Sequence, residues 1–276
     1  MHGKPRHVSL GINMKRSLVL LFLLVSFLFS CSSPSHYNGY IPSSVPSHFN
    51  HQNEYSTKVV QKTLWIPSSP RTVVHEVAPL ETLWRISKMY GVPVWKIRRA
   101  NHLKGDIIRI GQKLIIPGAK YFKNVIPLYP STKWRYIILH HTGTEIGKAT
   151  VIHRYHEDRG FIYGLGYHFL IDNGTLGKGD GQIEVSPRWI KQHDGAHCKA
   201  GGMNHKGIGV ALVGNFNKER PTPAQIDSLI LLVKILTEFY NIPPDHVLGH
   251  RDVPGARTDC PGRFFPWRRV RLALMK

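Results

Sequence analysis

Two histidines and a cysteine stand where their side chains could hold a metal ion together. The pair His140-His141 directly follows an apolar run, His250 lies in a Gly-His-Arg-Asp stretch, and Cys260 comes ten residues later. The intervening loop, residues 253–258, is rich in turn-forming residues and can fold back to bring Cys260 beside His250. Two imidazoles and a thiolate suit zinc, and three protein ligands leave the fourth position for a reactive water. The pattern indicates a hydrolytic zinc site, although among 17 histidines the residue types alone do not select this set.

The elements that must position these side chains predict an α/β fold, with a mixed β-sheet flanked by helices. Residues 136–139 are continuously apolar, as in a strand buried on both faces, and residues 207–213 have a similar composition. Residues 167–176 predict a hairpin that turns at an Asn-Gly pair. A capping box with proline at the first helical position predicts a helix over residues 222–241, and a further helix is expected over 149–158.

A smaller unit precedes this domain, and its predicted order is β-α-α-β. Strands are expected at residues 73–77 and 112–117, and short helices at 81–90 and 94–101. Six apolar residues are expected to form its core: Leu83, Ile86, Val94, Ile97, Ile107 and Leu114.

Charge and targeting signals restrict the possible partners. The 276 residues include 37 Lys and Arg against 17 Asp and Glu, a formal charge of +20 that favours polyanions. Met14 is a better candidate for the start of the chain than Met1, because basic residues follow it directly. An apolar run at 18–29 comes next and Cys31 follows it, which is the order of an export signal with a lipid-accepting cysteine. An uncleaved anchor helix is the alternative. Export argues against nucleic acid and favours the cell wall and the membrane surface.

The whole chain is therefore expected to have five parts. Residues 1–31 are the signal segment and 32–70 a disordered tether rich in Ser, Pro, His and Asn. Residues 71–118 form the small domain, 119–133 a linker and 134–276 the large domain.

The small unit resembles a LysM domain. The matching stretches are Glu-Thr-Leu-Trp at 81–84, Tyr-Gly-Val at 90–92, Ala-Asn at 100–101 and residues 110–117. The unit departs from the family at Pro79-Leu80, where a glycine usually precedes the acidic residue. The resemblance implies binding of N-acetylglucosamine-containing glycans, and so of peptidoglycan.

The large domain resembles the amidase family that includes the peptidoglycan recognition proteins and the amidase-type phage lysozymes. The similarity rests on residues 138–142, 166–171, 195–197, 204, 208–210 and 213–216, and on the stretches around His250 and Cys260, which occur in the family's order. It implies a zinc-dependent N-acetylmuramoyl-L-alanine amidase that cuts the amide between muramic acid and L-alanine.

The resemblance also implies roles for individual residues. His140, His250 and Cys260 match the zinc ligands, while His141 falls on a variable position. Tyr167 matches a tyrosine beside the metal, and Thr258 a position held by Lys or Thr; both are expected to assist catalysis at the oxyanion.

Three further residues are assigned to the substrate. His197 and Asn204 match positions in the substrate groove, and Arg257 is placed to meet a carboxylate of the stem peptide. The alternative for Cys260 is a disulfide with Cys198, since exported proteins with two spare cysteines often pair them.

The remaining polar candidates are expected to be structural. His168 follows Tyr167 on a strand, so it should point to the opposite side. Structural or surface roles are expected for His153, His156, His193 and His205. Arg251 and Asp252 are expected to fix their loop, or Asp252 to orient a ligand imidazole.

The sequence thus predicts a monomeric zinc amidase of the bacterial envelope, lipid-anchored at the outer membrane and facing the periplasm. Two other functions stay open: a peptidoglycan-binding receptor without activity, and an envelope tether in which the amidase fold is only a spacer. The first predicts bound wall without cleavage, and the second neither zinc nor activity.

Overall fold

The computed structural model describes residues 58–275. The signal segment, Cys31 and most of the predicted tether lie outside this range. Within it, no helix has both the length and the apolar character needed to cross a membrane.

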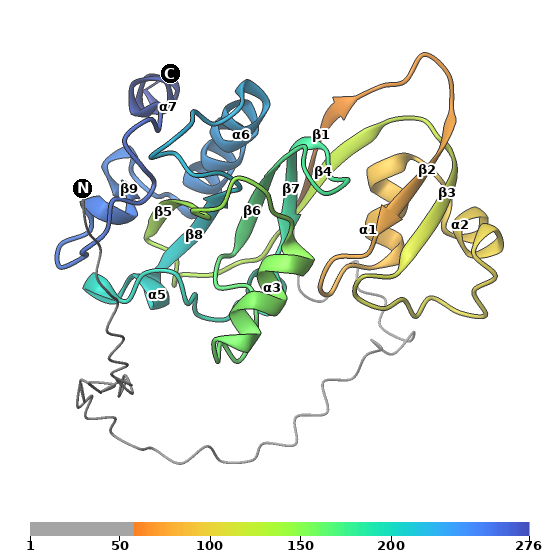
Figure 1. Cartoon of the computed structure of the whole chain (residues 1–276), viewed down its shortest axis with the longest axis horizontal. Coiled ribbons are helices and arrows are strands. Elements are labelled where there is room, and N and C mark those ends of the chain that lie inside the picture. Colours follow the sequence, from red (N-terminus) through yellow and green to blue (C-terminus); the bar gives the residue numbers. More distant parts are fainter. Residues whose placement is uncertain (1–57, 276) are drawn as a thin grey trace, which may run out of the picture. The chain divides into compact units, whose positions relative to one another are not determined.

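The small unit has the predicted β-α-α-β order. Strand β2 (Arg71–Glu76) pairs antiparallel with β3 (Lys113–Ala119), and helices α1 (Leu83–Tyr90) and α2 (Val94–Ala100) lie between them in sequence. The Thr82 side chain caps α1, which ends at a left-handed glycine with φ 65°. Figure 1 shows these elements in orange to yellow.

The core of this unit confirms most of the predicted positions. Leu83, Ile86, Ile97 and Leu114 are almost completely buried, and Val94 packs against them. Ile107 was wrongly placed in the core, because it lies in the loop between α2 and β3 and is 46 % exposed.

Two boundaries of the predicted domain plan are corrected. The expected tether contains strand β1 (Lys58–Trp65), and the expected linker contains β4 (Phe122–Leu128). The two strands pair antiparallel, and Phe122 and Val125 enter the core of the small unit. Pro127 is tolerated because β4 has only one strand partner, and its carbonyl accepts a hydrogen bond from the Trp189 indole.

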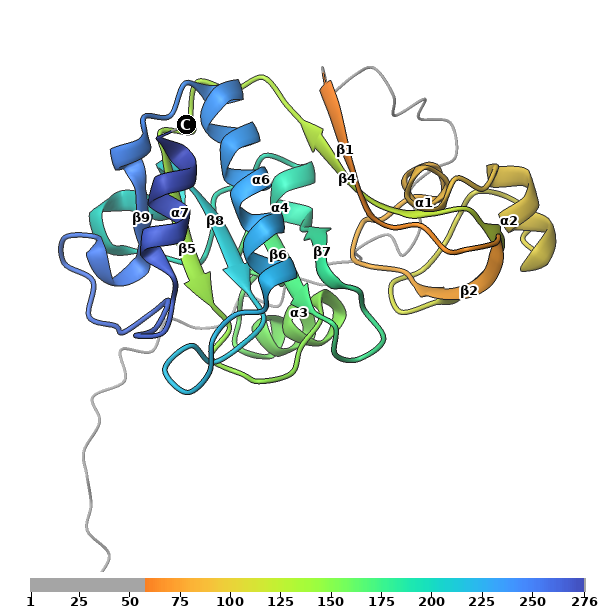
Figure 2. The same ribbon diagram turned by 90° about the horizontal axis from the view of Figure 1, so that it is seen from above.

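The large unit contains the predicted mixed sheet, with strand order β7-β6-β8-β5-β9 (Figure 2). Its strands are β5 (Tyr136–His141), β6 (Phe169–Asn173), β7 (Asp180–Val185), β8 (Gly207–Leu212) and β9 (Val247–Gly249). The pairs β6–β8, β8–β5 and β5–β9 are parallel, and β6–β7 is antiparallel.

Helices cover both faces of this sheet (Figure 1). Phe169 and Ile171 pack with residues of α6 (Pro223–Tyr240), whereas Leu170, between them, packs with residues of α3 (Ala149–Asp158). This alternation is what a strand covered on both sides requires. The other helices are α4 (Pro187–Ile190), α5 (Met203–Lys206), α7 (Trp267–Leu274) and the 3-10 turns Ala200–Gly202, Pro244–His246 and His250–Asp252.

A buried polar group lies between β6 and β7. Asp172 is fully buried, and neither of its carboxyl oxygens has a donor among the described groups. Burial and the neighbouring Glu184 carboxylate raise the Asp172 pKa well above its usual range. A protonated Asp172 can donate a hydrogen bond to Glu184, and Lys178 pairs with the other oxygen of Glu184 at 3.3 Å.

Candidate metal centre

The three predicted ligands come together at the end of strand β5. His140 is on β5, His250 opens the 3-10 turn after β9, and Cys260 lies on the following loop. One ligand atom from each lies within 4.8 Å of the others. His140 Nδ1 is 3.5 Å from Cys260 Sγ, and the His140 and His250 ring centres are 4.8 Å apart.

The loop that returns Cys260 is fixed by backbone hydrogen bonds. The Arg251 N–H donates to the Cys260 carbonyl at 2.8 Å, and the Cys260 N–H donates to Thr258 Oγ1 at 3.2 Å. The His141 N–H donates to Cys260 Sγ at 3.4 Å. Asp252 accepts from the Gly249 N–H at 3.1 Å, so it fixes the turn as expected.

His197 determines which nitrogen of His140 is free. The Gly207 carbonyl can only accept, so His197 Nε2, 3.1 Å away, carries the hydrogen. His197 Nδ1 must then accept, and His140 Nε2, at 3.1 Å, donates to it. The lone pair of His140 is left on Nδ1, the atom that faces Cys260.

Room for the His197 ring comes from two glycines. A Cβ at Gly209 would lie 2.4 Å from His197 Cδ2, and one at Gly195 would lie 2.3 Å from the same atom. Any side chain at either position would displace the ring. The two glycines therefore leave the space in which the His197 ring can orient His140.

The protonation of the three residues fits a divalent cation. Burial lowers the pKa of His140 well below its usual range, and neighbouring histidines add to this effect. Burial also lowers the pKa of His250, so both imidazoles are neutral at neutral pH, the form that binds metals. Burial raises the Cys260 pKa to about 12, so its thiolate needs a cation beside it. The chemistry of the donor set therefore fits zinc.

Tyr167 lies beside the His140 ring. The two ring centres are 5.2 Å apart. Burial, with the nearby Cys260, raises the Tyr167 pKa above its usual range. The phenol stays protonated at neutral pH and can act as a hydrogen-bond donor.

The other predicted site residues have varied surroundings. Thr258 and Arg257 are exposed on the returning loop. Asn204 Oδ1 accepts from the N–H groups of His197 and Cys198, each at 2.8 Å. Asn204 therefore orders the loop that carries His197. The substrate contacts of His197, Asn204 and Arg257 stay predictions.

Cys198 and Cys260 are both free and buried, so the alternative disulfide does not form. His141 accepts from the Phe216 N–H at 3.0 Å, which turns it away from the metal set. His168 bonds to the backbone of Gly209 and His193, as expected of a structural histidine.

Two families match the two units. The N-acetylmuramoyl-L-alanine amidase family (Amidase_2) matches residues 130–263, and the LysM domain family matches residues 75–117.

Several named proteins are similar to the larger unit. Peptidoglycan-recognition protein SC2 of Drosophila melanogaster is 32% identical over 145 residues, which span 49% of this chain and 72% of that protein. The human N-acetylmuramoyl-L-alanine amidase is 35% identical over 112 residues, 40% of this chain and 17% of that protein. Among solved structures, the N-acetylmuramoyl-L-alanine amidase LysC from Clostridium intestinale URNW is 34% identical, covers 52% of this chain and 89% of its own, and has a TM-score of 0.44.

Proposed function

Since the chain belongs to the N-acetylmuramoyl-L-alanine amidase family (Amidase_2), with a LysM domain before the amidase domain, we propose that it is a zinc-dependent peptidoglycan amidase. It cuts the amide between N-acetylmuramic acid and L-alanine, while the LysM domain holds the glycan. The observation that carries this proposal is the convergence of His140, His250 and Cys260, with ligand atoms within 4.8 Å of one another.

Each residue of the site has a chemical part. His140 Nδ1, a nitrogen of His250 and Cys260 Sγ would hold zinc, and zinc would supply a Lewis acid and lower the pKa of water at its open position. Tyr167, with its pKa raised by burial, keeps its proton and donates a hydrogen bond to the oxyanion as the carbonyl carbon becomes tetrahedral. The Thr258 hydroxyl accepts from the Cys260 N–H and retains its own hydrogen for the same oxyanion.

Substrate groups are assigned to the rim of the site. Arg257 is exposed on the returning loop, where a guanidinium can pair with a stem-peptide carboxylate. His197 and Asn204 are proposed to contact the stem peptide from the neighbouring loop. The protein acts as a monomer at the cell envelope, held to the outer membrane by a lipid on Cys31.

The test is digestion of purified sacculi by the full chain beside a Cys260→Ala variant. Release of stem peptides with a free L-alanine amine by the wild type, and none by the variant, is the expected result. Tyr167→Phe serves as the matched variant that leaves all three metal ligands in place. Binding of sacculi by the wild type without release of peptides would reject the amidase and leave the receptor function.

A further inference from the structure

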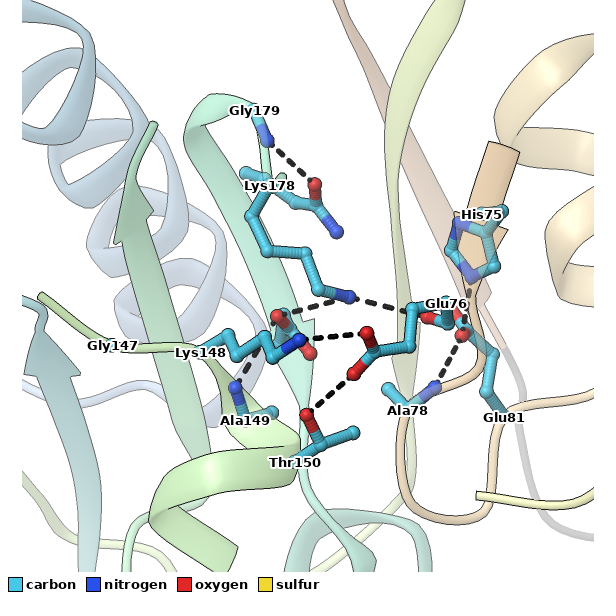
Figure 3. Close-up of polar contacts among 12 residues, drawn as sticks. His75, Glu76, Ala78, Glu81, Gly147, Lys148, Ala149, Thr150, Lys178 and Gly179 are labelled. Carbon is cyan, nitrogen blue, oxygen red and sulfur yellow. Dashed lines mark hydrogen bonds and ion pairs between the residues drawn. The ribbon is translucent and has the colours of Figure 1, made fainter. Parts of the chain in front are cut away.

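The LysM domain is tied to helix α3 of the amidase domain by one carboxylate. Glu76, the last residue of β2, accepts from Lys148 Nζ at 2.6 Å and from Thr150 Oγ1 at 2.7 Å (Figure 3). Its backbone carbonyl accepts from Lys178 Nζ at 3.3 Å. The junction is therefore built from charge-assisted hydrogen bonds that come from two separate segments of the amidase domain.

A second set of contacts joins the same two domains through strand β7. Asn124 on β4 donates to the Gly181 carbonyl at 3.0 Å and accepts from the Ile183 N–H at 2.7 Å. Arg85 on α1 donates to the Ile183 carbonyl at 3.3 Å. Because these side chains are buried, the LysM domain is attached at two places rather than hinged on one ion pair.

An open, shallow pocket of about 410 Å³ lies at this junction. It is lined by Glu76 and by residues of α3 and its N-terminal flank, among them Thr150, Val151, Arg154, Tyr155 and Asp158. The opposite face of α3 carries Ile152, His153 and His156, which are buried in the amidase domain. The cavity is therefore separate from the metal centre, and its walls come from both domains.

The lining has the composition of a site for a neutral polar ligand. Two cations, Lys148 and Arg154, are balanced by two carboxylates, Glu76 and Asp158. This balance disfavours an anionic polymer or a lipid headgroup, which the basic surface elsewhere would attract. Among the described residues, the side chains of Arg154 and Asp158 have no hydrogen-bond or ion-pair partner, so both side chains are free to bind hydroxyl and acetamido groups.

Tyr155 supplies an apolar surface in the same cavity. Its side chain is 57% exposed, and the Arg159 guanidinium lies 5.5 Å from the ring centre. An aromatic ring with a few polar groups around it offers the apolar and hydrogen-bonding contacts that a small polar ligand uses. A pyranose ring has one apolar face for the tyrosine and hydroxyl groups around its edge for Arg154 and Asp158.

From this geometry we propose that the junction cavity binds amino-sugar residues of the peptidoglycan glycan. A glycan strand held by the LysM domain would then continue along the outer face of α3. The inference rests on the proposed peptidoglycan function but concerns a second site, formed by both domains. Its consequence is that the LysM domain and the amidase domain bind the same glycan strand.

The test is calorimetric titration of the full chain, in detergent, with short and long oligomers of N-acetylglucosamine. For Tyr155→Ala, affinity for the long oligomer should fall roughly tenfold, about the loss expected from one aromatic contact. For Arg154→Ala it should fall roughly tenfold or more, about the loss expected from one hydrogen bond to a charged group. Affinity for chitobiose should fall by a smaller factor, because a disaccharide gains less from binding at two sites on one chain. Tyr155→Phe, which keeps the ring, should bind like the wild type.

Controls separate this site from general effects of charge and folding. Arg268→Ala removes an exposed arginine from α7, far along the chain from α3, and should leave binding unchanged. Val151→Arg should fill the cavity and weaken long-oligomer binding, and zinc content and the thermal midpoint report on folding of every variant. Equal affinities for all variants, or the same loss for Arg268→Ala, would overturn the proposal. Since binding needs no hydrolysis, the result can be interpreted even for a protein without amidase activity.

Discussion

The hydrogen bond from His197 to His140 should control how tightly zinc is bound. His197→Phe keeps a ring of similar size in the space left by Gly195 and Gly209, but removes the acceptor 3.1 Å from His140 Nε2. The buried N–H is then unpaired, which costs about 1–3 kcal/mol. Loss of such a partner typically lowers metal affinity by about 10–100-fold.

A second variant reaches the same ring without changing it. Gly209→Ala would place a Cβ 2.4 Å from His197 Cδ2, so the ring must leave the position in which it accepts from His140. Zinc affinity should fall in the same direction as for His197→Phe. Agreement of the two variants would assign the effect to the position of His197.

The assay is competition for zinc between the protein and a chromophoric chelator. His75→Phe is the matched control, because His75 is a buried histidine of the LysM domain whose two nitrogens bond to Tyr90 and Glu81. It should lower stability without changing zinc affinity. If His197→Phe bound zinc as tightly as the wild type, or lost no more affinity than the control, the reasoning would be refuted.

Three further changes test other parts of the site and the junction. Tyr167→Phe should lower kcat by about 10²-fold or more, with zinc content unchanged, when hydrolysis of a soluble muramyl peptide is followed. Glu76→Gln should lower the free energy of unfolding by about 1–3 kcal/mol at neutral pH. Burial alone would raise the Glu76 pKa, but hydrogen bonds such as that from Lys148 outweigh burial and lower it. The stabilisation by Glu76 is therefore present above the ordinary glutamate pKa and lost as the pH falls through the lowered one. The thermal unfolding midpoints of the wild type and of Glu76→Gln should therefore approach each other in acid. Asp172 has the opposite shift, raised by burial and by Glu184, so wild-type stability should fall as the pH rises above the ordinary aspartate pKa, and Asp172→Asn should reduce this dependence in denaturant titrations.

Local signals were sufficient for the elements that carry the site. The apolar run at 136–139 predicted β5, and the capping box at Thr222 predicted α6. This helix ends at Asn241 as expected, and Asn241 has the left-handed conformation. Leu80, just before Glu81, stands where the LysM family usually has glycine. Its φ of 56° lies in the left-handed region that favours glycine, so the loop keeps the backbone conformation although the residue differs. Each of these features depends on residues close together in the chain.

Long-range pairing explains what the sequence did not predict. Strands β1 and β4 pair with each other although almost the whole LysM domain separates them in sequence. The prolines in and after β4 indicated a linker instead. His197 acts on His140 from 57 positions away, and the role of Gly209 appears only when a Cβ is placed beside that ring. The residue types of the metal set were predictable, but the hydrogen bond that orients it was not.

The most direct test of the central claim is titration of metal-free protein with zinc while release of L-alanine amines from sacculi is followed. We expect hydrolysis to rise in proportion to bound zinc and to level off near one zinc per chain, with no response from Cys260→Ala. Hydrolysis that is already complete in the metal-free protein, or zinc-dependent hydrolysis by Cys260→Ala, would contradict the proposed centre of His140, His250 and Cys260.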